Sequence, residues 1–211
     1  MRFSIILITV LMGLLSGCAT VIDSTTSEPI SDNRGSRTAG QFIDDETAEV
    51  TIAVNLKKAS PELKVSNINV KVYNGVVLIS GQVPSEDARE TAGKVATQHR
   101  GVARVINQLE IAGKATVISE INDLTISTQV KALVLKDLGR NVYQRTLITT
   151  ENSIVYVMGF VTKTEAAALE NVVSSVRGVK RIVRVFEYID ESSDLTIRRA
   201  GRSRLGGSAF S

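Results

Sequence analysis

The fold is decided by the stretch NGVVLISGQV at residues 74–83, which is matched by NSIVYVMGFV at residues 152–161. A second pair of matching stretches follows: GVARV at residues 101–105 corresponds to GVKRI at residues 178–182. The two spacings differ by one residue, which indicates a duplicated unit of about 70 residues. Units of this size bury small hydrophobic cores, so we expect the two copies to pack against each other.

Each copy is predicted to fold as helix, strand, strand, helix, strand. In the first copy Asp44 or Asp45 is the expected cap of the opening helix, and Asn74-Gly75 is a strong signal for a hairpin turn. Apolar periodicity and turn residues then predict a helix to about residue 58, strands at 68–72 and 76–83, a helix at 85–99 and a strand at 102–111.

The second copy repeats this pattern with one change in its hairpin. Thr162 and Glu165 form a capping box, and the helix after them carries its apolar residues at helical spacing: Leu169, Val172, Val173 and Val176. Asn152-Ser153 replaces Asn-Gly, which predicts a turn that is strained or longer.

Composition excludes several classes of function. Of the 211 residues, 43% are apolar and 22% are charged, which is typical of one or two globular domains. A single Cys and a single His exclude a disulfide scaffold, a Cys/His zinc site and a Cys–His catalytic pair in the folded part. Few aromatic residues and no Trp argue against stacking platforms for single-stranded nucleic acid, and a net charge of +3 is too small to indicate an electrostatic partner by itself. No nucleic-acid partner is expected.

The first 17 residues have the pattern of a lipoprotein signal peptide. Arg2 precedes an apolar stretch, which ends in the lipobox Leu15-Ser16-Gly17-Cys18. We expect Cys18 to be lipidated; the alternative is a buried free thiol beside an uncleaved anchor. Ala19, rather than Asp, follows the Cys, which by analogy with bacterial lipoproteins predicts the periplasmic side of the outer membrane. The predicted organisation is signal peptide 1–17, lipidated flexible tether 18–41, first domain 42–112, linker 113–121, second domain 122–190 and basic disordered tail 191–211.

The hairpin pattern N-G-x-V-x-L-x-G-x-V with a later G-V-x-x-V resembles the BON domain family, over roughly residues 41–190. Other residues that carry the resemblance are Asp44-Asp45, Glu49-Val50, Val161-Thr162 and 178–181. It implies an α+β fold of two tandem αββαβ BON domains, each a small three-stranded mixed sheet packed against two helices. Two such domains behind a lipobox imply an outer-membrane lipoprotein without catalysis, metal or cofactor other than its covalent lipid. They also imply binding of anionic phospholipid through the second domain and a role in envelope integrity and cell division.

The helix that opens the second domain has two apolar faces. At 100° per residue, Ile126, Val130 and Leu133 are expected to face the sheet. The opposite face carries the candidate lipid-binding residues, which are Leu124, Lys131, Leu135 and Leu138. Exposed leucines beside a lysine suit an acidic lipid surface. Val50 and Val54 form a similar surplus face on the first helix, so domain packing stays open as an alternative, as do ordinary exposed apolar residues. The resemblance favours lipid.

The sequence supports three further expectations, which concern the C-terminal tail, a protein partner and the absence of catalysis. The tail carries Arg198, Arg199, Arg202 and Arg204, which either contact an acidic surface or are solvated. Instead of lipid, the leucine face can dock an envelope protein, which would make the chain an interaction adaptor. An enzyme is not expected, since His99 is placed to stabilise a helix end, and Asp44, Asp45 and Glu46 to stabilise a helix start.

Overall fold

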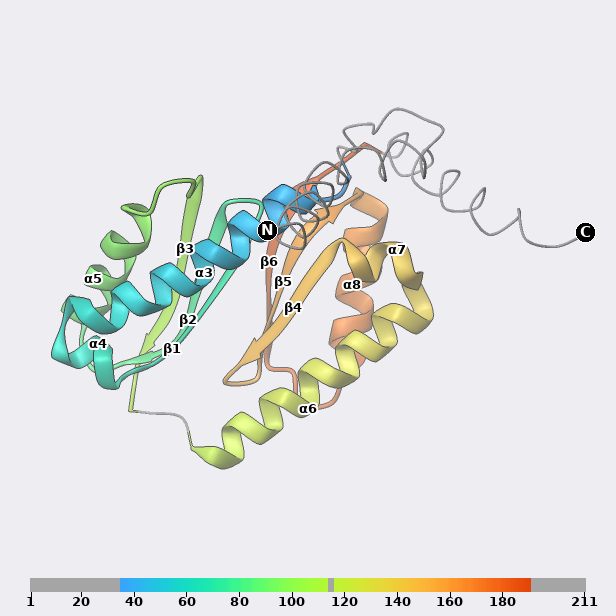
Figure 1. Cartoon of the computed structure of the whole chain (residues 1–211). Helices are drawn as coiled ribbons and strands as arrows, with labels where there is room; N and C mark the ends of the chain where they lie inside the picture. Colours follow the sequence, from blue (N-terminus) through green and yellow to red (C-terminus); the bar gives the residue numbers. More distant parts are fainter. Residues whose placement is uncertain (1–34, 114–115, 191–211) are drawn as a thin grey trace, which may run out of the picture. The chain divides into compact units, whose positions relative to one another are not determined.

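The computed structural model describes residues 35–113, which we call domain 1, and residues 116–190, which we call domain 2 (Figure 1). The elements of domain 1 are α3 (Ala39–Ala59), α4 (Pro61–Val65), β1 (Asn67–Tyr73), β2 (Val76–Val83), α5 (Glu86–Thr97) and β3 (Arg104–Ile111). Those of domain 2 are α6 (Val117–Leu133), the π-helical turn η1 (Val134–Leu138), α7 (Gly139–Gln144), β4 (Thr146–Glu151), β5 (Ile154–Val161), α8 (Lys163–Ser175) and β6 (Arg181–Tyr188).

Each domain contains one three-stranded mixed sheet. The strand order is β1-β2-β3 in domain 1 and β4-β5-β6 in domain 2. The hairpin strands pair antiparallel, whereas the last strand of each domain pairs parallel to the central strand after a helical crossover. The predicted α+β class and the tandem αββαβ order are thereby confirmed, with α4, η1 and α7 as additions.

The first helix begins earlier than predicted, inside the stretch expected to be a flexible tether. Thr38 caps it, because its hydroxyl accepts from the amide of Gln41, whose side chain accepts from the amide of Thr38. The prediction that Asp44 or Asp45 caps this helix is wrong. Asp45 is buried instead, and its carboxylate accepts hydrogen bonds from the backbone amides of Asn74 and Gly75 at 2.7 and 2.9 Å.

Domain 2 repeats this contact between helix and hairpin. Asp123 of α6 is buried and accepts from the amides of Asn152 and Ser153 at 2.7 and 2.8 Å. The Asn152-Ser153 turn keeps the two-residue length, with Glu151 paired to Ile154. Both of its central residues have positive φ, 50° and 64°. Of the two predicted alternatives the turn is therefore strained and not longer, and the buried carboxylate offsets that strain.

Helix α6 begins inside the stretch expected to be a linker, and it does not end as a simple helix. Thr116 caps it by accepting from the amide of Ser119. At its other end the chain widens into η1, and Gly139, at φ 86°, starts α7. In domain 1 the chain instead turns at Ser60, which caps the short helix α4, whose first residue is Pro61.

Three apolar clusters form the core of the described residues. One lies between the sheet and helices of domain 1, and a second lies between the sheet and helices of domain 2. The third joins the two sheets through side chains on their other faces, and its buried members are Tyr73, Val76, Leu78, Ile154, Tyr156, Met158 and Val185. The domains support each other through this third cluster, as expected for two small units.

Two of the hydrogen-bonded contacts between the domains are equivalent. The side-chain amide of Asn74 donates to Glu187 of β6, and that of Asn152 donates to Glu110 of β3. Each hairpin turn of one domain is thus held by the last strand of the other. The hydroxyl of Tyr73 also donates to the carbonyl oxygen of Arg145 at 2.6 Å.

The glycines inside β2 and β5 are required by close approach of the backbone. A Cβ at Gly81 would lie 2.0 Å from the carbonyl oxygen of Asn67, and one at Gly159 would lie 2.2 Å from that of Arg145. Both glycines have positive φ. Gly81 and Gly159 are therefore the same residue in both domains because any side chain at these positions would clash with the neighbouring strand.

Candidate functional site

The candidate site is a row of exposed side chains along α6. Leu124 is 68% exposed and Leu135, just beyond the helix in η1, is 45% exposed. Lys131 is exposed as well. On the other side of the helix Ile126 and Val130 are buried in the core of domain 2, as the helical wheel predicts.

The exposed row is longer than the sequence analysis predicted. Its added members precede residue 122 and are Val117, Ile118 and Ile121. Ile118, at 80% exposed, is the most exposed large apolar side chain among the described residues. At 100° per residue Val117, Ile121 and Leu124 share one face of α6. They were missed because the domain was expected to start at residue 122; Thr116, three residues before Ser119, is the capping signal that would have included them.

Leu138 does not belong to this row. It is half-buried and packs against the core of domain 2 together with Leu133. The prediction that Leu138 lies on the exposed face is wrong, because the wider π-helical turn shifts the residues after Val134 around the helix axis. The domain-packing alternative is also wrong for Leu124 and Leu135, since the domains meet through their sheets and both leucines stay exposed.

Helix α6 is held firmly from its buried side. Asp123 bonds to the hairpin turn, and the hydroxyl of Ser127 donates to the hydroxyl of Thr150 at 2.7 Å. Asn122 adds a bond from its side-chain amide to the hydroxyl of Ser153. The exposed row is therefore displayed on a rigid element rather than on a loop.

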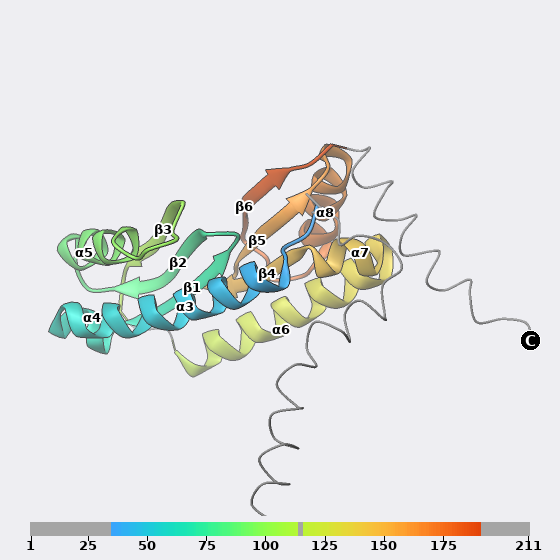
Figure 2. The ribbon, with the colours of Figure 1, turned by 45° about the horizontal axis from the view of Figure 1, so that its top comes forward.

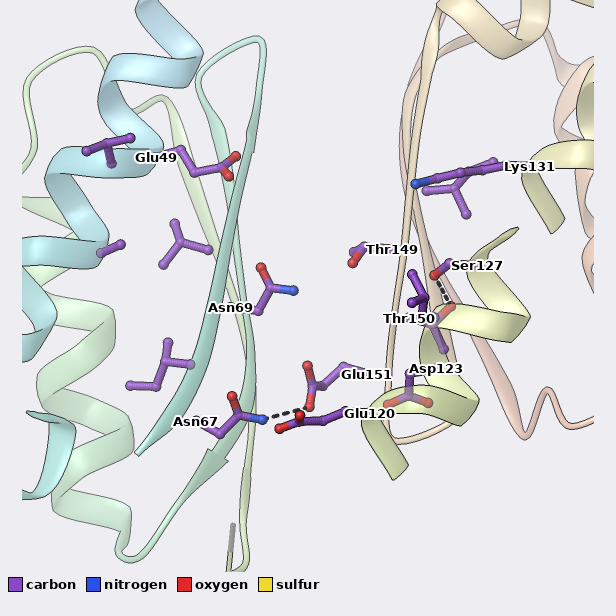
Figure 3. A pocket seen from close by; sticks show the side chains of 16 residues that line it. Glu49, Asn67, Asn69, Glu120, Asp123, Ser127, Lys131, Thr149, Thr150 and Glu151 are labelled. Atoms are coloured by element: carbon purple, nitrogen blue, oxygen red, sulfur yellow. Dashed lines mark hydrogen bonds between the residues drawn. The ribbon is translucent and has the colours of Figure 1, made fainter. Parts of the chain in front are cut away.

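A groove of about 580 Å³ runs beside this helix, between α3 and β1 of domain 1 and α6 and β4 of domain 2. The two long helices α3 and α6, drawn as ribbons in Figure 2, both contribute residues to its lining. Val50 and Leu124 line it from the two domains, and Lys131 lies at the end of the groove away from Glu120 and Glu151 (Figure 3).

The other end of the groove is acidic. Glu151 accepts hydrogen bonds from Gln82 at 2.9 Å and from Asn67 at 3.4 Å, so it joins the two domains. Burial raises the pKa of Glu151, and the charges of nearby Asp123, Glu120 and Glu110 raise it further against the opposing bond from Gln82. A partly buried carboxylate at the domain boundary is thus disfavoured in its charged form.

Within residues 35–113 and 116–190 no group of three or more His, Cys, Asp or Glu side chains is arranged to hold a metal ion. His99 follows α5, and its backbone amide bonds to the carbonyl of Ala96. Over the same residues no helix is long and apolar enough to cross a bilayer. Cys18 and the arginines at 198, 199, 202 and 204 lie outside the described residues.

Comparison with known proteins gives a consistent result. Residues 44–113 and 122–190 match the family model described as BON domain. The Haemophilus influenzae protein named outer membrane lipoprotein DolP is 35% identical over 154 residues, which cover 73% of this chain and 79% of the relative. The Actinobacillus pleuropneumoniae protein named 21 kDa hemolysin is 33% identical over 153 residues, covering 72% and 78%. The Escherichia coli osmotically-inducible protein Y is 28% identical over 149 residues, covering 68% and 72%.

Proposed function

The chain belongs to the BON family and is an outer-membrane lipoprotein, and from this premise we propose that it binds anionic phospholipid through the exposed row of α6 and so supports envelope integrity. The first attachment is the acyl chains on Cys18, and α6 supplies the second. An anchored domain meets the membrane at a high effective concentration, so even a weak second contact is populated.

The observation that carries this proposal is the combination of exposed leucines with a lysine along α6 and the adjoining turn η1. Leu124 and Leu135 can enter the boundary between headgroups and acyl chains, while the ammonium group of Lys131 stays with lipid phosphate. Full burial of a leucine side chain contributes about 1.5–3 kcal/mol. Two leucines and one lysine thus suffice for a contact that is reversible and depends on lipid charge.

The test uses the full lipidated chain in vesicles, with an environment-sensitive fluorophore on a single introduced thiol. Cys18 is the only native Cys, so lipidation leaves the wild-type chain without a free thiol, and its failure to take up label is the first control. Leu124→Cys is expected to show a blue-shifted emission in phosphatidylglycerol vesicles and an aqueous emission in phosphatidylcholine vesicles. Asn171→Cys, exposed on α8 of the same domain, is the matched control and should report water in both.

The adaptor hypothesis is the other outcome of this experiment. An aqueous emission at position 124 in both kinds of vesicle would contradict lipid binding and leave the row to a protein partner. Salt sharpens the distinction, because a contact that uses Lys131 weakens between low and physiological ionic strength, whereas docking on an apolar protein surface changes little.

A further inference from the structure

Domain 1 has a concave surface of about 610 Å³ where α3 ends and α4 begins. We call it the lysine patch, and its lining residues are Val54, Lys57, Lys58, Ala59, Ser60, Pro61 and Lys64. We propose that the lysine patch is a second site for anionic phospholipid headgroups, so that both domains contact the membrane. This proposal rests on the membrane contact proposed for α6 and extends it to the other domain.

The local fold explains why the lysines gather there. Lys57 and Lys58 occupy the last turn of α3, where cations are favoured by the helix dipole. The chain then turns at Ser60, and its hydroxyl accepts from the amide of Leu63. Because Leu63 is buried in the core of domain 1, the short helix α4 is fixed and its neighbour Lys64 is exposed at the same junction.

No ion pair among the described residues compensates the charge of the patch. Elsewhere in domain 1 Lys71 pairs with Glu49, and Lys94 pairs with Glu90. Among the described residues Lys57, Lys58 and Lys64 form no ion pair, although they lie around one concave surface. Three free ammonium groups in one place match the charge of phosphate-bearing headgroups.

The apolar side chains of the lysine patch favour a phospholipid over a soluble polyanion as its ligand. Val54 and Pro61 line the patch and are exposed, so they can lie against glycerol and the upper acyl chains while the lysines bind phosphate. A soluble polyanion would bind the lysines but would leave these apolar surfaces in water. The helix dipole accounts for cations at the end of α3, but it gives no reason for exposed Val54 beside them.

The patch also continues the surface proposed for α6. Leu124 of α6 and Val50 of α3 line the same groove. Val54 lies one helical turn beyond Val50, is exposed like it, and lines the lysine patch. An exposed apolar path therefore leads from α6 across α3 to the three lysines.

The test places the fluorophore of the α6 experiment at Ala59→Cys in the full lipidated chain. A blue shift in phosphatidylglycerol vesicles, absent in phosphatidylcholine, is expected. Replacing Lys57, Lys58 and Lys64 with Glu should abolish it, because each lysine lost weakens the contact about fivefold and the added charge repels the surface. A matched variant carries the same change in charge on another face of domain 1, by replacing Lys94, Arg100 and Arg104 with Glu, and should keep the signal.

The outcomes separate this proposal from the one on α6. A blue shift at position 124 with an aqueous signal at position 59 would overturn the lysine patch and leave the α6 contact standing. Equal losses in the two charge variants would also overturn it, since net charge alone would then explain binding. If the lysines only complement the helix dipole, replacing them with Glu would lower the melting temperature and leave the fluorescence signal at position 59 unchanged. That result too would overturn the lysine patch. Soluble glycerol phosphate in excess should not displace the signal, whereas displacement would show a free-phosphate site instead.

Discussion

Domains 1 and 2 share the contacts that build the fold and differ in the surfaces around the end of the first helix. Asp45 and Asp123 hold their hairpins in the same way, and Gly81 and Gly159 permit the same close approach of strands. At the offset that relates Asn74 to Asn152, however, Lys57 of the lysine patch corresponds to Leu135 of the α6 row. Buried contacts and close backbone approaches thus keep their residues in both domains, apart from the turn position where Ser153 stands in place of Gly75, whereas exposed positions differ in chemistry.

A second difference lies in the interior. Arg145 of domain 2 forms a buried ion pair with Glu165 at 2.6 Å, and its side chain is only 3% exposed. Its guanidinium also donates to the carbonyl of Asn141. The equivalent position in domain 1 holds Asn67, whose amide donates to Gln82 and Glu151. Domain 2 therefore depends on a buried ion pair at a position where domain 1 uses the hydrogen bonds of an uncharged amide, one of them to the carboxylate of Glu151.

The largest expected effect breaks this pair. Arg145→Leu should lower the free energy of unfolding by about 3–5 kcal/mol, because it leaves Glu165 buried without its cation. Asn67→Ala, the equivalent change in domain 1, should cost only about 1 kcal/mol. Urea unfolding followed by circular dichroism gives both values. Equal costs would mean that the ion pair is no more critical than the hydrogen bonds that stand in its place.

The hairpin turns allow an exchange between the domains. Gly75→Ser should destabilise by about 1–2 kcal/mol, since a side chain at φ 72° is strained and its Cβ would lie 2.9 Å from the carbonyl of Gly101. Ser153→Gly should stabilise by less than about 1 kcal/mol, because it relieves strain at φ 64° but loses the bond from Asn122. Thermal unfolding of the two variants should shift in opposite directions. A shift in the same direction would show that the turns are not equivalent.

The repeat made the fold predictable, because local signals agree with it. The Asn-Gly turn, the capping box at Thr162 and the apolar faces of the helices all lie where the sequence predicts them. Less was predictable where two local signals compete. Asp45 has the character of a helix cap, but Thr38 lies earlier and already provides one, so Asp45 is free to bind the hairpin. The equal spacing of Asp45 before Asn74 and Asp123 before Asn152 carried that information.

The candidate site was predictable in part. Leu124 and Leu135 follow from the helical wheel, but a wheel assumes a regular helix and so misplaces Leu138 at the end of the π-helical turn. The lysine patch required tertiary structure, because Lys64 joins Lys57 and Lys58 only through the turn at Ser60. Sequence periodicity reports which face of one helix is exposed, but it does not report which residues gather around a break between two helices.

The smallest expected effect concerns Glu151, which joins the domains at the acidic end of the groove. Because the folded protein raises the pKa of Glu151 above its ordinary value of 4.5, the charged form costs stability, and that cost disappears as the pH falls through the raised pKa. Glu151→Gln keeps an oxygen that accepts from Gln82 and Asn67 but removes the charge. It should raise the melting temperature at pH 7 and give no gain below about pH 4.5, since the wild-type side chain is then neutral too. Glu46→Gln, on the exposed side of α3, should give no comparable gain at pH 7, and if both variants gain equally the effect belongs to net charge and not to the domain boundary.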